Sequence, residues 1–488
     1  MLPSSIFAGQ KGRNRYTHAF SPFIDKGFIV QASDFSTIEL SADMVANLTA
    51  LNYTTLTPIQ AKSLPLILQG KDVIAQAKTG SGKTVAFGVG LLSQVKAERC
   101  ETQALILCPT RELAEQVSKE IRKLARTMPN LRVVCLSGGV PLASQLASLA
   151  SGAHVVVGTP GRVDDHLRRK SLCVENMRIL VLDEADRMLE MGFQDIIAEI
   201  LAVLPEKRQT LLFSATYPDS VLSMSQHMQR NPVQIEVVET AEELLIKQLF
   251  YSVKTEDKCR ILALLLLEQK PEAALVFCNT KQDCKEICEF LKKKGFSVRE
   301  IHGDLDQRER NEVLVQFSNR SLSILVATDV AARGIDIKDL PLVINFSLSK
   351  DPHVHVHRIG RTGRAGKEGL AISLYSGQEE FRMKQICEYQ KTKIERGVIT
   401  SEKALSERPS YPPMQTLYLQ AGRKNKLRAG DVLGALTAVG GIAAADVGKI
   451  DLFDTYCYVA VKRSVAAKAL DLILTGKTKG RSIKARYM

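Results

Sequence analysis

The sequence lacks long hydrophobic runs, and this absence limits what the protein can be. No apolar stretch of the 488 residues approaches the roughly 20 residues that span a bilayer, so we expect no transmembrane helix. The stretch MLPSSIFAGQKGRNRYTHAF at the start holds no apolar segment of the signal-peptide type, which argues against secretion.

The ten cysteines form no CxxC pair. Cys284 and Cys288 lie one helical turn apart without a second ligand pair, which favours buried free thiols over a zinc site, so we expect a reducing, cytoplasmic compartment.

Composition and charge are those of a soluble protein with an uneven charge distribution. Hydrophobic residues make up 45% and charged residues 24%, and the length fits about three domains of about 150 residues. The net charge is +13, and residues 413–488 contain 13 Lys and Arg against 5 Asp and Glu, a net of +8. This concentration favours a module that binds a polyanion, nucleic acid first, with a merely solvated basic surface as the alternative.

Short apolar runs alternate with helical patterns along most of the chain. The first series of runs comprises residues 72–76, 104–109, 132–138, 154–160, 179–186 and 210–216. After a break near residues 231–240, a second series comprises residues 273–280, 297–304, 323–330, 342–348 and 369–376. Continuous apolar strands separated by helices predict parallel sheets covered on both faces, so we expect two similar α/β lobes in tandem.

The C-terminal part follows a different pattern. Strand-like runs at residues 416–422, 447–454, 455–462 and 482–488 alternate with helical patterns at 430–439 and 464–474, in the split βαββαβ order. The N-terminal extension carries no motif; we expect it to be poorly ordered or to reflect the choice of start site, with Val30 as an alternative first residue. The predicted regions are the extension (1–34), lobe 1 (35–237), lobe 2 (238–400), a proline-containing linker (401–413) and a small α+β domain (414–488).

Residues 77–84, AKTGSGKT, follow an apolar run and precede a helical pattern. Glycines at this position let backbone N–H groups approach phosphate, and the following helix N-terminus favours an anion. Lys83 is suited to the β and γ phosphates of ATP, and the Thr84 hydroxyl is suited to Mg²⁺. The strict pattern has Gly where Ala77 stands. The stretch still predicts a phosphate-binding loop, formed by Ala77, Lys78, Thr79, Gly80, Ser81, Gly82, Lys83 and Thr84.

A second stretch, ILVLDEADRM (179–188), ends an apolar strand in three acids, Asp183, Glu184 and Asp186. Like charges at one strand end repel and are costly to desolvate, so a cation is expected there. Mg²⁺ bound to ATP supplies it, because P-loop NTPases hold this metal with an Asp at the end of a neighbouring strand. Asp183 fits that role, and Glu184 would orient or deprotonate the attacking water. A helix N-terminus enriched in acids explains one or two carboxylates but not the strand before them.

These residues and nine further short motifs resemble those of a DEAD-box ATP-dependent RNA helicase. The sequence Asp-Glu-Ala-Asp, which gives that family its name, is formed here by Asp183, Glu184, Ala185 and Asp186. The resemblance covers about residues 35–376 and implies two RecA-like lobes. It departs at Asn52 and Leu56, where the family has Gly and Pro, which puts the backbone geometry of the adenine-reading loop in question. The nine motifs are LTPIQ (56–60), PTRELAEQ (109–116), GG (138–139), TPGR (159–162), SAT (214–216), LVFCNT (275–280), QRER (307–310), ATDVAARGID (327–336) and HRIGRTGR (357–364).

The resemblance implies a role for each residue at a motif position. Gln60 would read the adenine edge with Phe35 stacked on the ring, and Asp336 would contact the ribose or the closed interface. Arg361 and Arg364 match arginine fingers, which meet charge developing on the γ-phosphate. RNA backbone contacts are implied for Pro109, Thr110, Arg111, Gly138, Gly139, Thr159, Pro160, Gly161, Arg162, Gln307, Arg310, Thr328, Asp329 and Gly334. Coupling of ATP state to RNA grip is implied for Asp186, Ser214, Thr216, His357 and Arg358.

Three histidines, His353, His355 and His357, alternate along the second lobe as metal ligands can. Only His357 falls in a motif, and no further ligand cluster is visible in the sequence. Structural histidines are therefore the favoured interpretation.

Residues 414–488 resemble the RNA-recognition-like (RRM-like) C-terminal domain of bacterial DbpA-type helicases, through VLGALTAVGG (432–441) and VGKI (447–450). The resemblance implies targeting to a hairpin of 23S ribosomal RNA. Three tyrosines fall where such domains stack bases, and cross-strand packing suits them equally: Tyr418, Tyr456 and Tyr458. Asp454 and Val461 depart from the usual third-strand pattern. Salt-dependent RNA binding is expected from two basic clusters, Arg423, Lys424, Lys426, Arg428 and Lys477, Lys479, Arg481.

The motifs together predict an RNA helicase that uses ATP and Mg²⁺ and locally, non-processively unwinds short RNA duplexes. ATP and single-stranded RNA would each favour closed lobes, so their binding would be coupled reciprocally. We expect a cytoplasmic monomer that acts on 23S rRNA and pre-50S particles during assembly of the large ribosomal subunit. Two alternatives stay open. A DNA translocase would be stimulated equally by DNA and RNA, and an ATP-locked RNA clamp would hydrolyse ATP without separating a short duplex.

Overall fold

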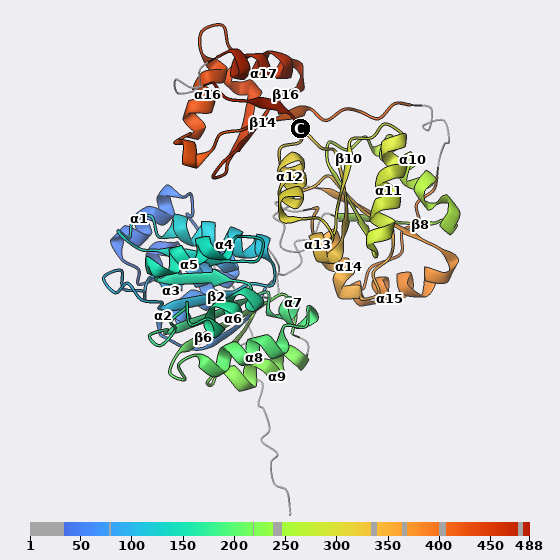
Figure 1. Ribbon diagram of the computed structural model, residues 1–488. Coiled ribbons are helices and arrows are strands. Elements are labelled where there is room, and N and C mark those ends of the chain that lie inside the picture. Colours follow the sequence, from blue (N-terminus) through green and yellow to red (C-terminus); the bar gives the residue numbers. More distant parts are fainter. Residues whose placement is uncertain are drawn as a thin grey trace, which may run out of the picture.

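Three sheets, each packed against helices, make up the described part of the chain (Figure 1). The computed structural model describes residues 34–77, 80–217, 219–237, 246–332, 339–363, 368–399, 407–476 and 482–488. The predicted fold class, two tandem RecA-like parallel-sheet lobes followed by a small α+β domain, is confirmed. Outside the described residues lie 1–33 and the predicted site residues Lys78, Thr79, Gly334, Asp336, Arg364, Lys477, Lys479 and Arg481.

The sheet of lobe 1 has seven parallel strands in the order β3-β4-β2-β5-β6-β1-β7. Its inner strands are continuous apolar runs, such as ALIL in β2, because helices bury them on both faces. The strands are β1 Val73–Gln76, β2 Ala104–Leu107, β3 Val133–Leu136, β4 Val155–Gly158, β5 Ile179–Asp183, β6 Gln209–Ser214 and β7 Val233–Glu236. The helices are α1 Ala42–Ala50, α2 Pro58–Leu68, α3 Lys83–Leu92, α4 Arg111–Leu124, α5 Leu142–Ala150, α6 Pro160–Arg168, α7 Ala185–Glu190, α8 Gln194–Val203 and α9 Asp219–Met228.

The sheet of lobe 2 has six parallel strands in the order β10-β11-β9-β12-β13-β8. The strands are β8 Ile246–Ser252, β9 Ala274–Cys278, β10 Val298–Ile301, β11 Ile324–Thr328, β12 Leu342–Asn345 and β13 Gly369–Tyr375. The helices are α10 Lys258–Gln269, α11 Lys281–Lys293, α12 Gln307–Ser318, α13 Asp329–Ala332, α14 Pro352–Ile359 and α15 Glu380–Gln390. As in lobe 1, the loops after the strands carry the predicted motifs, because the carboxyl ends of parallel strands meet at one edge.

Two strands of these sheets are missing from the sequence prediction. β7 lies within the predicted break and pairs in parallel with β1. β8 pairs in parallel with β13. Each is the last strand of its sheet, and only Ile235 of β7 is fully buried. Edge strands of this kind lack the continuous apolar pattern on which the prediction depended.

The C-terminal domain is a four-stranded antiparallel sheet in the order β15-β16-β14-β17, with two helices. This order, with the βαββαβ sequence of elements, is the predicted RRM-like arrangement. Its core gathers apolar residues such as Leu417, Val459 and Ile473. The strands are β14 Met414–Leu419, β15 Val447–Leu452, β16 Cys457–Lys462 and β17 Ala485–Tyr487, and the helices are α16 Ala429–Thr437 and α17 Ala466–Thr475.

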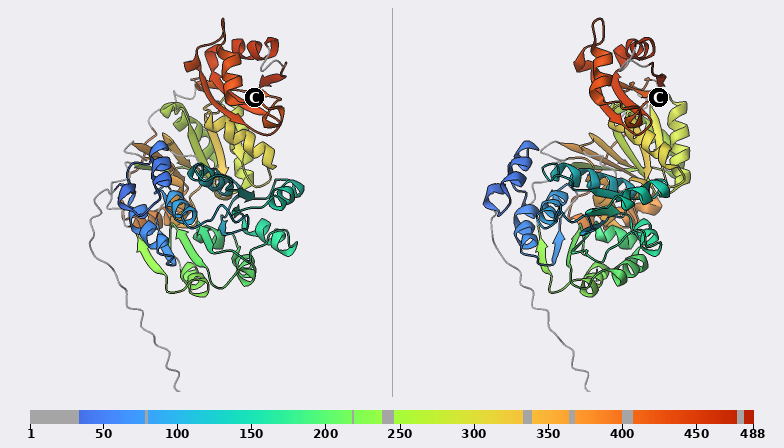
Figure 2. Two further views of the ribbon diagram at one scale, coloured as in Figure 1. Left: turned by 90° about the vertical axis from the view of Figure 1, so that its left-hand side faces the viewer. Right: turned by 60° about the vertical axis from the view of Figure 1, so that its left-hand side comes forward.

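The C-terminal domain rests on lobe 2 at the end of α12 (Figure 2). Thr416 is fully buried there, with its hydroxyl 2.6 Å from that of Ser321 and within 3.4 Å of the Asn319 amide. Lys449 of β15 adds a bond to the Ser318 hydroxyl at 3.2 Å. The sheet of the C-terminal domain is thereby held against a helix that begins with predicted RNA contacts.

Candidate active site and nucleic-acid interface

The described residues of the phosphate loop surround the N-terminus of α3. Gly80 and Gly82 both have φ of +92°, and a Cβ on Gly82 would stand 2.4 Å from the amide nitrogen of Gln60, so this position requires glycine. Lys83 is buried, and its Nζ donates to the carbonyl of Ala77 at 2.9 Å. The ammonium group therefore lies inside the loop, where the predicted phosphate contact would be made.

The adenine-reading loop is tied to the phosphate loop. Gln60 Nε2 donates to the Gly82 carbonyl at 3.1 Å, and Gln60 Oε1 accepts from the Thr57 backbone at 2.9 Å. Asn52 adopts φ of +63°, a left-handed conformation that Asn tolerates, so its departure from Gly keeps the turn. Phe35 is 1% exposed within the lobe 1 core. Stacking of adenine on Phe35 stays a prediction and requires the ring to be uncovered.

The carboxylate of Asp183, at the end of β5, is buried without a hydrogen-bond partner for Oδ1 among the described residues. Burial raises the pKa of Asp183 to about 7, against the opposing effect of the Lys83 ammonium. A buried, charged carboxylate of this kind destabilises the folded protein unless a cation binds to it. The Asp183 carboxylate and the Thr84 hydroxyl supply oxygen atoms, which are the ligands that Mg²⁺ prefers. Glu184 follows at φ +53° and ψ +52°, an uncommon left-handed conformation that turns the chain into α7.

Asp186 connects the DEAD segment to the loop after β6. Its Oδ2 accepts from the backbone of Thr216 at 3.1 Å and from the Thr216 hydroxyl at 2.9 Å. The Ser214 hydroxyl donates to the Thr216 carbonyl at 2.6 Å. The structure thus brings together three residues for which coupling is predicted, and the coupling itself stays a prediction.

Lobe 2 faces the phosphate loop with α14. Burial lowers the pKa of His357 far below its usual range, and the next cause is Arg187 of lobe 1, opposed by Asp186. The charges of Arg361 and Lys83 also act on this ring. One imidazole is therefore within electrostatic reach of the phosphate loop, the DEAD segment and a predicted arginine finger. The two lobes are also in direct contact, through Arg111 and Gln307 and through Glu112 and Arg310.

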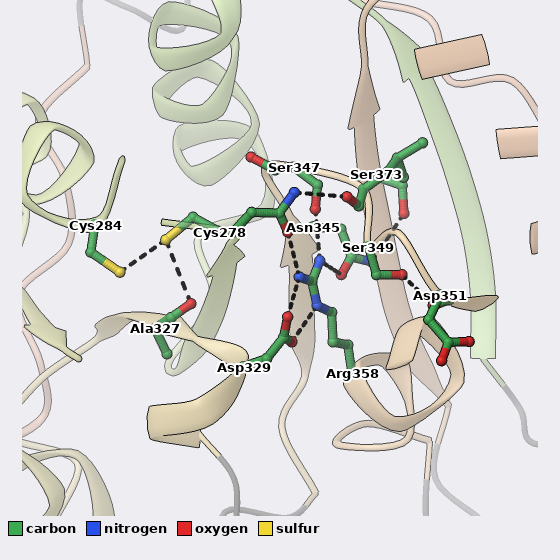
Figure 3. A network of polar contacts seen from close by, with 12 residues as sticks. Cys278, Cys284, Ala327, Asp329, Asn345, Ser347, Ser349, Asp351, Arg358 and Ser373 are labelled. Carbon is green, nitrogen blue, oxygen red and sulfur yellow. Dashed lines mark hydrogen bonds and ion pairs between the residues drawn. The ribbon is translucent and has the colours of Figure 1, made fainter. Parts of the chain in front are cut away.

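Arg358 of α14 is a buried arginine that binds Asp329 (Figure 3). Its Nε and Nη2 donate to the Asp329 carboxylate at 2.6 and 2.7 Å. Its Nη1 donates to the Ser347 carbonyl at 2.6 Å, and Nη2 donates to Asn279 Oδ1 at 2.9 Å. Asn345 accepts from Nη1 at 3.3 Å. The Asp329 carboxylate is therefore engaged within lobe 2, and its predicted RNA contact stays a prediction.

The sequence predicts no role for Asn279 or Asn345, because uncharged amides at strand ends carry no signal by themselves. Only the fold shows that both surround the Arg358 guanidinium, whose planar donors suit several acceptors at once.

The predicted RNA contacts of lobe 1 lie close together at one edge of its sheet. A Cβ on Gly138 would stand 2.7 Å from the Arg111 guanidinium, and one on Gly139 would stand 2.9 Å from it. Arg162 Nη1 donates to the Val140 carbonyl at 3.3 Å, in the same turn. Helix N-termini favour phosphate, and two of them occur here. Helix α4 begins after Thr110, whose side chain accepts from the Leu113 backbone, and α6 begins after Thr159, whose side chain makes no capping bond. Pro109, Pro160 and Gly161 adjoin them.

The predicted RNA contacts of lobe 2 meet those of lobe 1 directly. Gln307, the first residue of α12, accepts from Arg111 Nη1 at 3.2 Å. Arg310 is paired with Glu112, a residue of the PTRELAEQ motif to which sequence analysis assigned no role. Thr328 ends β11 immediately before Asp329.

The aromatic face of the C-terminal sheet points toward α12. Ring centroids of Tyr418, Tyr456 and Tyr458 lie 5.3–5.9 Å apart. Tyr458 is fully buried, and burial followed by the Glu312 carboxylate of α12 raises its pKa. Tyr458 therefore packs within the protein in this arrangement, whereas Tyr418 and Tyr456 are half-buried. The structure favours cross-strand packing over base stacking for Tyr458.

The first basic cluster lies on the surface of the C-terminal domain. Arg423, Lys424, Lys426 and Arg428 are all exposed, around a short 3-10 helix that begins at Arg423. Arg423 lies near α4 of lobe 1, because its charge contributes to the lowered pKa of Arg122, of which burial is the main cause. One member of the cluster, Arg423, is thus close to lobe 1, which carries predicted RNA contacts.

The three alternating histidines have separate surroundings. His353 lies against Tyr389, with Nδ1 3.1 Å from the hydroxyl, whereas His357 faces lobe 1. His355 is fully buried beside Phe250. In the part of the chain that the structure describes, no group of three or more His, Cys, Asp or Glu side chains is placed to hold a metal ion.

Replacing His355 by phenylalanine is expected to make the protein less sensitive to acid. Burial, followed by the Arg358 charge, lowers the pKa of His355 to about 3, so the native state holds the ring neutral while the unfolded chain titrates near its usual pKa of about 6.5. The contribution of neutral His355 to the free energy of unfolding is fully present above about pH 6.5. It is lost as the pH falls toward 3, by up to about 1.4 kcal/mol per pH unit. Urea unfolding of both proteins at neutral and mildly acidic pH tests this, and equal acid losses would contradict it.

Comparisons with known proteins agree with this geometry. Residues 57–224 match the DEAD/DEAH box helicase family, residues 257–366 the helicase conserved C-terminal domain, and residues 416–487 the DbpA RNA binding domain. The chain is 48% identical over 455 residues to the ATP-dependent RNA helicase DbpA of Escherichia coli (strain K12), covering 93% of this chain and 99% of that protein. The chain belongs to the DEAD-box ATP-dependent RNA helicases. As a member, it is an RNA-stimulated ATPase that converts ATP and water to ADP and phosphate.

Other relatives share the helicase core. The DEAD-box ATP-dependent RNA helicase CshA of Geobacillus kaustophilus is 44% identical over 365 residues, which are 74% of this helicase and 78% of that protein. The solved structure of S. cerevisiae Dbp5 bound to RNA and ADP BeF3 superposes with a TM-score of 0.69 at 32% identity, covering 75% of this helicase and 96% of that chain. Within the described ranges of the helicase, no helix has the length and apolar character needed to cross a membrane.

Proposed function

We propose that this helicase acts on 23S ribosomal RNA and pre-50S particles during assembly of the large ribosomal subunit, directed there by its C-terminal domain. The observation that carries this proposal is an exposed basic cluster on a domain that matches the DbpA RNA binding domain: Arg423, Lys424, Lys426 and Arg428. Because Tyr458 of the aromatic face is fully buried, this exposed cluster is the better candidate for phosphate contacts. DbpA-type targeting to 23S rRNA is what the family resemblance implies.

We further propose that ATP binds between the phosphate loop and α14, with Mg²⁺ held by the Thr84 hydroxyl and Asp183. Mg²⁺ would neutralise charge on the β and γ phosphates. Lys83 would exchange its bond with the Ala77 carbonyl for one with phosphate. Glu184 would orient or deprotonate the attacking water, and Arg361, with Arg364, would meet the charge that develops on the γ-phosphate.

Closure of the lobes on the RNA backbone would hold one strand without reading its bases. An RNA strand that is bent by lobe closure is incompatible with a duplex, so we propose local, non-processive separation of short RNA helices.

We also propose that the helicase acts in the cytoplasm and that it is a monomer. All ten cysteines are free thiols, as expected in a reducing compartment.

Removal of residues 414–488 is expected to abolish the preference for 23S rRNA and to leave an ATPase with weak, generic RNA stimulation. The measurement is ATPase activation by 23S rRNA fragments and by unrelated RNA of equal length. In the full chain, replacing Arg423, Lys424, Lys426 and Arg428 by glutamine should weaken binding of the active fragment and lower its salt slope by about 0.7–0.9 for every phosphate that is no longer neutralised. The matched control replaces the exposed Lys292 and Lys293 of α11. A truncated protein with its full 23S rRNA preference would falsify the targeting role.

A further inference from the structure

Glu112, in the first turn of α4, bonds across the two lobes to Arg310 of α12. Arg310 Nη2 and Nε lie 2.9 and 3.1 Å from Glu112 Oε1. Gln307 Nε2 reaches the same oxygen at 3.4 Å, and Gln307 Oε1 accepts from Arg111 Nη1 at 3.2 Å. Four side chains, two from each lobe, thus form one polar chain among the residues predicted to grip RNA.

The Glu112–Arg310 pair is largely shielded from solvent. The side chains are 12% and 14% exposed, whereas those of the pair Asp165–Arg169, within lobe 1, are 37% and 53% exposed. Arg310 Nη2 also donates to the Ala331 carbonyl at 3.4 Å, so this guanidinium is engaged on both sides. A largely buried charge that loses its partner is strongly destabilising, so each of these two side chains depends on the other.

We infer that Glu112 is a positioning residue of the helicase cycle: it holds Arg310, and through Arg310 it holds the two lobes in the closed arrangement. Arg310 in consequence acts on Glu112 and not on an RNA phosphate. A carboxylate at the RNA face would repel phosphate if it stood alone, and Arg310 neutralises it there. This inference concerns the helicase core and is independent of the proposed targeting to ribosomal RNA.

The pair can form only when the lobes come together, so it stabilises the closed arrangement and no other. RNA and ATP are expected to favour the same arrangement, and loss of the pair therefore weakens their apparent binding through linkage. The groups that perform hydrolysis are not touched. The KM for RNA should consequently rise, while kcat at saturating RNA and ATP changes much less.

The test is RNA-stimulated ATP hydrolysis with single-stranded poly(U) of one length. Glu112→Gln and Arg310→Gln are each expected to raise the KM for RNA about tenfold, with kcat within about threefold, because each leaves the partner charge unpaired. The exchanged variant E112R/R310E should return the KM to within about threefold of the unaltered protein. The matched control, Arg169→Gln, breaks an ion pair within lobe 1 and should leave the KM unchanged.

Salt dependence separates this role from a direct phosphate contact. If Arg310 bound phosphate, Arg310→Gln would reduce the slope of log KM against log salt by about 0.7, and a glutamate at that position would be the worst variant of all. An unchanged slope together with recovery in E112R/R310E supports the inference. A slope reduced by about 0.7, or an exchanged variant that binds RNA more weakly than either single variant, overturns it. Thermal unfolding of every variant reports whether the lobes remain folded.

Discussion

Replacing Glu184 by glutamine is expected to slow RNA-stimulated ATP hydrolysis by about 10²–10⁴-fold while ATP and RNA still bind. Glutamine keeps the shape of the side chain at the left-handed turn after β5 but cannot accept a proton from water. Because Asp183, Thr84 and Lys83 are unaltered, the nucleotide site should still close, and the protein should remain on RNA as a long-lived complex with ATP. Single-turnover hydrolysis and the dissociation rate of a fluorescent RNA measure the two effects.

The control for Glu184→Gln is Glu199→Gln, which removes an exposed carboxylate on α8 and should leave hydrolysis unchanged. Two results would count against a catalytic role for Glu184. One is hydrolysis at the unaltered rate. The other is loss of ATP binding, which would mean that the carboxylate serves the fold of the turn and not the reaction.

Replacing Lys83 by alanine is expected to abolish measurable ATP turnover, a loss of at least about 10²–10³-fold. Its ammonium group lies buried inside the phosphate loop, 2.9 Å from the Ala77 carbonyl, and no other cation of the described loop takes that place. Without it, the charge of the β and γ phosphates is left uncompensated in a buried site. ATPase rates and binding of a fluorescent ATP analogue are the measurements.

Lys71→Ala is the matched control for Lys83→Ala, because Lys71 is exposed just before β1 in the same lobe. It should behave as the unaltered protein does. RNA binding without nucleotide should be the same in both variants, which shows that the lobes have folded. Turnover by Lys83→Ala within about tenfold of the unaltered rate would contradict the assigned phosphate contact.

The sequence alone determined the parts of this protein that depend on local patterns. Continuous apolar runs located the buried strands of both lobes, because a parallel sheet covered on two faces leaves no position for polar alternation. The glycines of residues 77–84 predicted a loop whose backbone can approach phosphate. In the structure Gly80 and Gly82 both have φ of +92°, a conformation that favours glycine. The DEAD segment fell at a strand end as expected, with Asp186 bonded to Thr216.

Only the tertiary structure decided which polar groups find one another. The edge strands β7 and β8 have weak apolar patterns, and their place in a sheet depends on a partner far along the chain. Burial of Phe35 and Tyr458 follows from what packs over them, which their neighbours in sequence do not specify. Glu112 and Arg310 stand 198 residues apart, and each by itself is an ordinary charged residue on a helix. Their pairing exists because two separately folded lobes meet at that point, and a contact between surfaces leaves no periodicity in either segment.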